Sequence, residues 1–245
     1  MDDHFDWLTF LSEFSRAAAR QGFTPEILHE TEDGPIIAWE RGGEEPPIYL
    51  SAGIHGDEPA GPLAALRLME GGAFPVNRHC IICPALNPCG LAMNTRENRQ
   101  GADLNRDYIL LTCPETAAHT RWLLSKPVPG LFISLHEDWE THGFYFYEIN
   151  LVEDDAHRAS NLLCAVAAHF PAEIGPEIDG HALRSAGWIF HRAEADLPDS
   201  WPEAIWLAKR GCPLSFTFET PSKATLSKRV AAHVAGVRAL LLDWV

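Results

Sequence analysis

The chain is 245 residues long, which is enough for one large α/β domain, and nothing in it marks a second. Hydrophobic residues make up 46% of it, so it can bury a sizeable core. The formal net charge of −15 comes from 19 Lys and Arg against 34 Asp and Glu. So acidic a chain argues against binding of nucleic acid or of anionic membrane surfaces.

The N-terminus and the cysteines predict a cytoplasmic protein. Residues 1–7 are acidic and lack the basic and apolar stretches of a secretory signal. No segment approaches the length of about 18 apolar residues that a membrane span needs. The six cysteines are therefore expected to be reduced thiols, mostly in the core. Cys80 and Cys83 have redox spacing, but they fall in a strand pattern, where an odd offset points side chains to opposite faces.

Hydrophobic periodicity predicts alternating helices and strands in the first half of the chain. Apolar residues at helical spacing favour an amphipathic helix over 4–21, and a second helix is expected from near Glu58 to Met69. The segment from Leu86 to Tyr108 has little periodicity, and so long an irregular stretch inside a compact domain is usually functional. Strands are predicted over 36–40, 48–52 and 80–85.

The alternation continues in the second half. Helices are predicted over 115–125, 156–169 and 223–244, and strands over 131–135, 144–147 and 213–218. Residues 175–212 show no clear pattern. Strands that alternate with helices predict an α/β fold of three layers, α/β/α, in which helices cover both faces of a mixed, mainly parallel, twisted sheet.

The most informative stretch covers residues 48–61. Its apolar beginning predicts a buried strand, which opens into a turn and then a helix. Open α/β sheets place their ligands at such carboxyl ends of strands. His55 and Glu58 can face one point if the two glycines of the turn let it curl back. An imidazole and a carboxylate are two of the three protein ligands that a hydrolytic zinc needs.

Two further side chains stand at the ends of apolar strands, His136 and Glu219. Taken alone, such a histidine is more often the partner of a backbone carbonyl than a ligand. Glu58 could be a first-turn glutamate favoured by the helix dipole, and Glu219 a surface carboxylate. Together, His55, Glu58 and His136 make a His₂Glu zinc set, and Glu219 supplies the carboxylate that such a site uses to deprotonate water.

The irregular segment contributes three arginines to an acidic chain: Arg96, Arg99 and Arg106. Arginine captures carboxylates with two parallel hydrogen bonds and stabilises oxyanions. For Arg99 we prefer the interpretation of a solvated loop residue in surface ion pairs. For Arg96, Asn105 and Arg106 we expect a part in the site.

These motifs occur in a recognisable order: His55-Gly-Asp-Glu58, Thr95-Arg96-Glu-Asn98, Asp103-Leu104-Asn105-Arg106, Ser134-Leu135-His136 and Phe218-Glu219. In order and spacing they resemble the zinc metallocarboxypeptidase family, of the carboxypeptidase A type. The amino-acid sequence of the loop is most similar to that of the small bacterial murein peptide amidase-type branch. Its Asp-Leu-Asn-Arg element is shared with the succinylglutamate desuccinylase and aspartoacylase relatives. The resemblance implies a zinc carboxypeptidase-like, phosphorylase/hydrolase-like fold. It implies a single catalytic domain over 1–245, with residues 1–34 as an N-terminal helical extension.

The resemblance also implies the metal site and the groups around it. His55, Glu58 and His136 would bind one zinc ion, while Asp103 would accept a hydrogen bond from the distal nitrogen of His55. Glu219 would be general base towards the zinc-activated water and then acid towards the leaving amine.

Substrate binding is implied for the loop residues. Arg96 would polarise the scissile carbonyl and hold the developing oxyanion, and Asn105 and Arg106 would bind the free carboxylate of the substrate. The family usually also has a tyrosine on a mobile loop before the catalytic glutamate. None of the four tyrosines lies between the hairpin after His136 and Glu219. The candidates for closing the site instead are Trp188, His191 and Trp201.

The implied activity is that of an enzyme, a zinc metallopeptidase that cleaves an amide bond next to a free carboxylate in a small peptide or peptide-like substrate. One alternative is an N-acyl amino acid deacylase of the succinylglutamate desuccinylase/aspartoacylase type. Those relatives carry an extra C-terminal domain over the site, and this chain ends at Val245, which favours the peptidase. Another is a non-catalytic metal-binding module, which would not require Glu219 and Arg96.

The cofactor and the partners are predicted only in part. Zinc follows from ligand type and family, although related sites accept other divalent ions. A second ion near Asp138 and His142 is a minor alternative. We expect neither nucleic acid nor membrane as a partner. The sequence leaves the natural substrate and the oligomeric state open.

Overall fold

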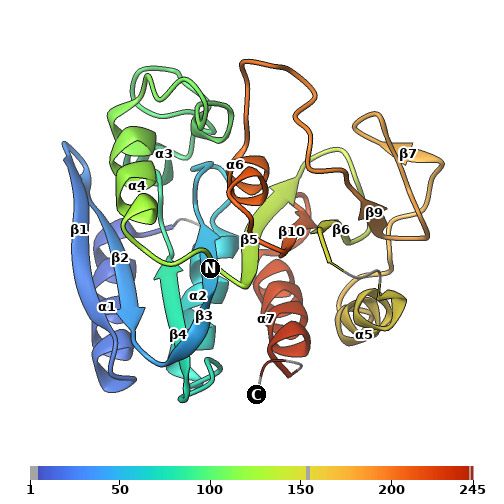
Figure 1. Cartoon of the computed structure of the whole chain (residues 1–245), viewed down its shortest axis with the longest axis horizontal. Coiled ribbons are helices and arrows are strands. Elements are labelled where there is room, and N and C mark those ends of the chain that lie inside the picture. Colours follow the sequence, from blue (N-terminus) through green and yellow to red (C-terminus); the bar gives the residue numbers. More distant parts are fainter. Residues whose placement is uncertain (1–4, 153–154, 243, 245) are drawn as a thin grey trace.

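The computed structural model describes residues 5–152, 155–242 and 244. An eight-stranded sheet in the order β1-β2-β4-β3-β5-β10-β6-β9 runs through the molecule (Figure 1). Its four central strands are parallel to one another, whereas β1–β2, β2–β4 and β10–β6 are antiparallel. The prediction of a mixed, mainly parallel sheet is confirmed. The central strands are β4 (Arg78–Cys83), β3 (Glu44–Ala52), β5 (Leu131–Asp138) and β10 (Leu214–Pro221).

The outer strands include one that the periodicity did not predict. β1 (Thr24–Thr31) pairs with β2 (Gly34–Arg41) at one edge, and β6 (Tyr145–Asn150) and β9 (Trp188–Phe190) form the other. Most side chains of β1 are exposed, so it lacks the apolar alternation of a half-buried strand. The expectation of a helical extension over residues 1–34 is therefore wrong for Thr24–Thr31, which form this strand.

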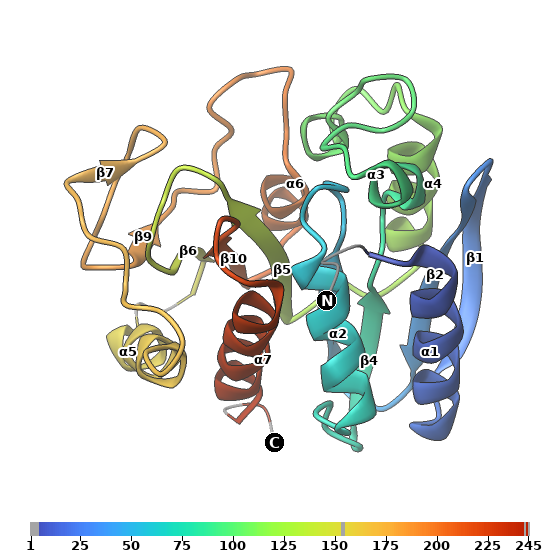
Figure 2. The same ribbon diagram turned by 180° about the vertical axis from the view of Figure 1, so that it is seen from behind.

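Helices cover both faces of the sheet, which confirms the three layers. Figure 2 shows the longer helices of one face, and they enclose the larger core with the sheet. Other helices lie on the opposite face over a second core. The first face carries α1 (Trp7–Arg20), α2 (Ala60–Glu70), α5 (Ala156–Val166) and α7 (Leu226–Leu242), and the second carries α4 (Pro114–Leu124) and α6 (Glu203–Lys209).

Burial on both faces explains why the central strands are continuous apolar runs. Every residue of β5 from Leu131 to His136 is buried, because helices cover the sheet on either side. Cys80 belongs to the larger core and Cys83 to the second one, as their odd offset predicted. All six cysteines are free thiols, and only Cys164 is exposed. No helix of the described residues is both long and apolar enough to cross a membrane.

The less regular segments gather at the end of the sheet where β3, β5 and β10 finish (Figure 1). The stretch after β4, expected to be irregular, contains the short helix α3 (Pro88–Met93), capped by the side chain of Asn87. It also contains a single 3₁₀ turn, Leu104–Arg106. The two-residue strands β7 (Glu177–Ile178) and β8 (His181–Ala182) form a small separate hairpin.

Candidate active site

His55 and Glu58 lie in the turn that joins β3 to α2. The chain leaves the strand through Gly53, whose φ of +62° is a conformation that glycine adopts without strain. At Gly56 the requirement is space, because a Cβ atom there would lie 1.8 Å from the backbone carbon of Gly90. The two glycines let the turn curl back as expected, each for a different physical reason.

The buried side chain of Asn87 fastens this turn to the loop that follows β4. Its Nδ2 donates to the carbonyl of Ile54 at 3.2 Å, and its Oδ1 accepts from the amide of Gly90 at 2.9 Å. The amide of Gly56 also donates to the carbonyl of Thr95 at 3.0 Å. The position of His55 therefore depends on a loop that is distant in the sequence.

His136 and Glu219 lie side by side on neighbouring strands. They are Cα partners in the parallel pair of β5 and β10, so their side chains point to the same face of the sheet. The next residue, Glu137, points to the other face. There its carboxylate accepts from the amide of Ala60 at 2.8 Å, at the start of α2, and pairs with Arg229 of α7. Glu137 thus ties the helix that follows Glu58 to the strand that carries His136.

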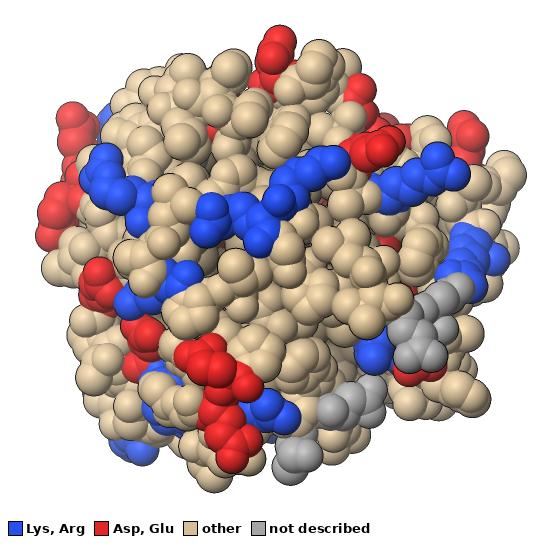
Figure 3. Space-filling view, viewed as in Figure 1, with Lys and Arg blue, Asp and Glu red and all other residues tan. Residues whose placement is uncertain are grey.

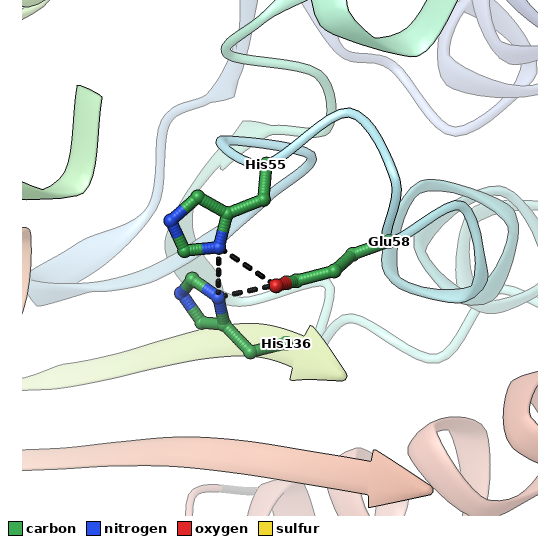
Figure 4. Close-up of side chains that lie close together, drawn as sticks. All are labelled: His55, Glu58 and His136. Atoms are coloured by element: carbon green, nitrogen blue, oxygen red, sulfur yellow. Dashed lines mark hydrogen bonds and ion pairs between the residues drawn. The ribbon is translucent and has the colours of Figure 1, made fainter. Parts of the chain in front are cut away.

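Three buried side chains converge at this point (Figure 4). Nδ1 of His55 lies 2.8 Å from Oε1 of Glu58, and Nδ1 of His136 lies 2.9 Å from Oε2 of Glu58. The two Nδ1 atoms are 3.2 Å apart. Ligands around a tetrahedral zinc, with bonds of about 2.0–2.2 Å, are separated by roughly 3.2–3.6 Å. The structure brings together the residues that the sequence singled out as ligands, and their spacing is close to what one ion requires.

Asp103 and Arg96 surround this group. Nε2 of His55 lies 3.1 Å from Oδ1 of Asp103, on the side of the ring away from Glu58. Nη2 of Arg96 lies 3.1 Å from Oδ2 of the same Asp103, and its Nη1 lies 3.3 Å from Oε1 of Glu58. A hydrogen bond to the distal nitrogen leaves Nδ1 of His55 free to act as a ligand.

The electrostatics of the group favour a cation. Against the effect of burial, His55 and His136 hold the pKa of Glu58 below its ordinary range. Burial, and after it the negative charge of Glu58, raises the pKa of Glu219 well above its ordinary value. Burial also lowers the pKa of His136, which favours the neutral imidazole that a metal needs. Two carboxylates that oppose each other's ionisation would both be stabilised by a divalent ion between them.

A cavity of about 680 Å³ opens over these groups, a size typical of small-molecule sites. Asp103 does not line it, because it lies behind His55. Arg99 instead pairs with Asp33 at 2.5 Å on the surface, as expected for a solvated loop arginine. The predicted site residues that line the cavity are His55, Glu58, Arg96, Asn105, Arg106, His136 and Glu219.

The net charge of −15 is unevenly spread over the surface. On the face drawn in Figure 3, Lys and Arg side chains form a broken band across the upper middle, while Asp and Glu lie in separate groups. A local basic surface allows an anionic group to approach an acidic protein.

The two substrate-binding candidates differ in how firmly they are held. Oδ1 of Asn105 accepts from the amide of Glu203 at 3.0 Å, which leaves its Nδ2 donor for another partner. Arg106 is exposed, and its Nη1 donates to the neighbouring carbonyl of Asn105 at 2.9 Å. A guanidinium in this setting can reorient towards a ligand at little cost.

Glu203, a residue that sequence reasoning missed, lies buried beneath this part of the cavity. Its carboxylate accepts from the hydroxyls of Tyr49 and Ser51, each at 2.7 Å. Tyr49 also contacts His119, whose other ring nitrogen lies 2.8 Å from the hydroxyl of Tyr108. The sequence around Glu203 indicated only a helix start, because a glutamate directly after a proline is typical of one. The burial of its side chain depends on the tertiary structure.

Burial raises the pKa of Glu203 from 4.5 to about 7. Because the pKa of Glu203 is higher in the folded than in the unfolded state, the free energy of unfolding falls as the pH rises from 4.5 through about 7. The total loss of stability is about 3 kcal/mol. Glu203→Gln should lose this dependence, so its free energy of unfolding should gain about 3 kcal/mol relative to wild type between pH 5 and pH 8. Denaturant titrations at both pH values measure the difference. The exposed control Glu30→Gln should parallel wild type, and a parallel course for Glu203→Gln would contradict the assignment.

Of the three residues proposed to close the site, one lines the cavity and two lie elsewhere. His191 lines the cavity, together with Tyr145 and Tyr147 of β6. Trp188 and Trp201 are not among the described residues that line it. Trp188 is instead buried on β9, and the indole nitrogen of Trp201 donates to the carbonyl of Pro198 at 3.0 Å.

The structure gives no support to a second ion held by Asp138 and His142. Asp138 lines the cavity and accepts from the hydroxyl of Tyr145 at 3.1 Å. The side chain of His142 is exposed and contacts the carbonyl of Thr141. Among the described residues, neither belongs to a group of converging ligand atoms.

The sequence is similar to known proteins over part of its length. Residues 44–112 match the succinylglutamate desuccinylase/aspartoacylase catalytic domain family. That segment includes His55, Glu58, Arg96 and Asp103 but ends before His136 and Glu219. Carboxypeptidase SOL1 of Arabidopsis thaliana is 33% identical over 108 residues, an alignment that covers 34% of this chain and 22% of that protein.

Solved structures match almost the whole chain. A candidate metallopeptidase from Shewanella denitrificans superposes with a TM-score of 0.85 at 24% identity, over 97% of this chain and 90% of that one. A metallo-carboxypeptidase from Burkholderia cenocepacia superposes with a TM-score of 0.74 at 14% identity, over 98% and 69% of the two chains. At such identities the similarity establishes the fold, and it extends over β5 and β10, which the family match to residues 44–112 does not reach.

Proposed function

We propose that this chain, a zinc carboxypeptidase-like protein related to the succinylglutamate desuccinylases and aspartoacylases, is a zinc-dependent metallopeptidase that cleaves an amide bond next to a free carboxylate. One observation carries the proposal. The Nδ1 atoms of His55 and His136 and the carboxylate of Glu58 lie within 3.2 Å of one another, and Glu219 is paired in register beside His136.

The donor set fits zinc. Two imidazole nitrogens and one carboxylate are the ligands of hydrolytic zinc sites, which keep one position open. When bound, zinc supplies a Lewis acid and lowers the pKa of its water to about 7. His55, Glu58 and His136 would hold the ion, and Asp103 would keep the His55 ring oriented through Nε2.

Glu219 would carry the proton in the reaction. Its side chain lines the cavity beside His136, and from there the ionised carboxylate would take a proton from water and return it to the leaving amine. Arg96 reaches the same point from the loop, within 3.3 Å of Glu58. Its guanidinium would donate hydrogen bonds to the carbonyl oxygen as negative charge develops there.

Asn105 and Arg106 would anchor the carboxylate of the substrate. Both line the cavity, and Nδ2 of Asn105 is left as a donor by the bond between its Oδ1 and the amide of Glu203. An arginine beside an amide donor suits a carboxylate, which accepts several hydrogen bonds at once. A peptide with a free C-terminus supplies such a group next to its last amide bond.

A second candidate is deacylation of an N-acyl amino acid. It is favoured by the family match over residues 44–112, and it needs the same metal, base and carboxylate anchor. The two substrates differ only on the acyl side of the amide bond.

Metal analysis combined with a substrate panel tests the proposal. The protein should contain one tightly bound zinc, lose activity with a chelator and regain it with Zn²⁺. Small peptides and a murein tripeptide should be hydrolysed faster than N-acyl amino acids, and C-terminal amidation should abolish turnover. Preference for N-acyl amino acids would instead support the deacylase, and inactivity of the zinc-loaded protein on every amide would refute both.

We expect Arg106→Ala to raise KM by about 10- to 100-fold with little change in kcat. The contact is with a carboxylate that does not react, so it contributes equally to ground state and transition state. A hydrogen bond between charged groups contributes about 1.5–3 kcal/mol. Steady-state kinetics on a dipeptide measure the effect, and Arg99→Ala is the matched control, because Arg99 pairs with Asp33 on the surface. An effect confined to kcat would argue against the anchor.

A further inference from the structure

A second group of ligand-capable side chains lies on the wall of the same cavity. Among the described residues, two groups of His, Cys, Asp or Glu have ligand atoms within 4.8 Å of one another. One is His55, Glu58 and His136, and the other is His181, His191 and Asp196. The second group comes from the β7–β8 hairpin and from the segment that follows β9, at the right of Figure 1.

The hairpin presents His181 by a specific turn. Asp179 and Gly180 connect β7 to β8 with φ values of +48° and +75°, the left-handed pair that closes a two-residue hairpin. His181 is the first residue after this turn and pairs with Ile178. Its position is therefore set by backbone geometry and not by chance contact of a long side chain.

His191 is held from the other side by the main sheet. Its amide donates to the carbonyl of Glu148 at 2.8 Å, which continues the pairing of β9 with β6. Tyr147 of β6 packs edge-on against both imidazoles, with ring centroids 5.6 Å from His181 and 6.0 Å from His191. The two imidazole centroids are themselves 4.7 Å apart. One tyrosine thus restricts both rings, which lowers the entropy cost of placing them around an ion.

The spacing of the polar atoms suits a shared ion better than a direct bond. Nε2 of His181 and Oδ2 of Asp196 are 3.5 Å apart. A hydrogen bond between nitrogen and oxygen would bring them to about 2.7–3.2 Å, whereas two ligands of one tetrahedral zinc are roughly 3.2–3.6 Å apart.

We propose that His181, His191 and Asp196 form a second divalent-metal site on the cavity wall. Two imidazoles and one carboxylate select zinc or a similar borderline ion over calcium or magnesium. The side chain of Asp196 is 72% exposed, so this site binds more weakly than the buried one. The ion joins the β7–β8 hairpin to the segment after β9, and it would stiffen this part of the wall. The proposal does not depend on the activity of the first site.

Titration of the full chain with zinc, monitored by calorimetry and checked by elemental analysis, tests the proposal. Wild type should bind two equivalents, one tightly and one weakly. The double variant His181→Ala/His191→Ala should keep only the tight equivalent, and His136→Ala should keep only the weak one. A matched control, His157→Ala/His169→Ala, removes two histidines of α5 and its C-terminal end and should retain both equivalents.

Two further readouts keep the test independent of folding defects. Asp196→Asn changes an exposed side chain and should weaken the second site by at least about tenfold without affecting the first. Hydrogen exchange of residues 177–196 should slow when Zn²⁺ is added to wild type but not to the double variant. Binding of the tight equivalent alone in wild type, or of two equivalents in the double variant, would overturn the second site. Binding of the weak equivalent alone in wild type would instead count against the proposed function.

Discussion

The Glu219→Gln variant should retain the metal, but its kcat should fall by about 10²- to 10⁴-fold. The substitution keeps the shape of the side chain and removes its capacity to take up a proton, which is the contribution expected of a general base. Glu219 is buried beside His136 and does not belong to the three converging ligands, so the ion should stay in place. Metal content by elemental analysis and turnover of a dipeptide at saturation measure the two effects separately.

The control for this prediction is Glu140→Gln. Glu140 is an exposed glutamate at the edge of the same cavity, so its substitution removes the same charge without touching the reacting groups. Turnover should stay close to wild type. Full activity of Glu219→Gln would end the proposed mechanism, and loss of metal together with activity would show that Glu219 acts through the ion.

Arg96→Ala should lower kcat by about 10²–10³, with a smaller effect on KM. A donor aimed at the developing oxyanion acts mainly in the transition state, and removing one typically costs this much. The side chain of Arg96 is 38% exposed, and its guanidinium is already held at the site by Asp103 and Glu58, so it is preorganised for this role. Single-turnover and steady-state rates on the same peptide measure the loss.

A matched variant separates this role from a purely electrostatic one. Arg96→Lys keeps the charge but not the planar fork of donors, and we expect it to recover only part of the lost rate. Metal affinity must be measured in both variants, because Arg96 contacts Glu58 and Asp103. If weaker metal binding accounted for the whole loss, Arg96 would be a positioning residue.

The arrangement follows from the topology of the sheet. β3, β5 and β10 are adjacent and parallel, so their carboxyl ends meet at one edge. Each delivers one part of the site: the turn with His55 and Glu58, then His136, then Glu219. Ligands of open α/β sheets bind at such edges because loops there can change without disturbing the buried strands.

The sequence alone determined most of the fold and the identity of the central residues. Continuous apolar runs predicted the four central strands, because a strand covered on both faces must be apolar throughout. Helical spacing predicted α1, α2, α4, α5 and α7. Residue type and place at the ends of strands were enough to predict His55, Glu58, His136 and Glu219 as candidate site residues.

Only the tertiary structure revealed the elements and contacts that have no local sequence pattern. β1 is mostly exposed and has no apolar alternation, and the 175–212 region is built of two- and three-residue strands and a short helix, too brief for any period. Glu203 is buried by contacts with Tyr49 and Ser51, which are about 150 residues away in sequence. His181, His191 and Asp196 are likewise brought together by pairing with the sheet. Such groups depend on which distant backbone segments pair, and pairing is a property of the whole fold.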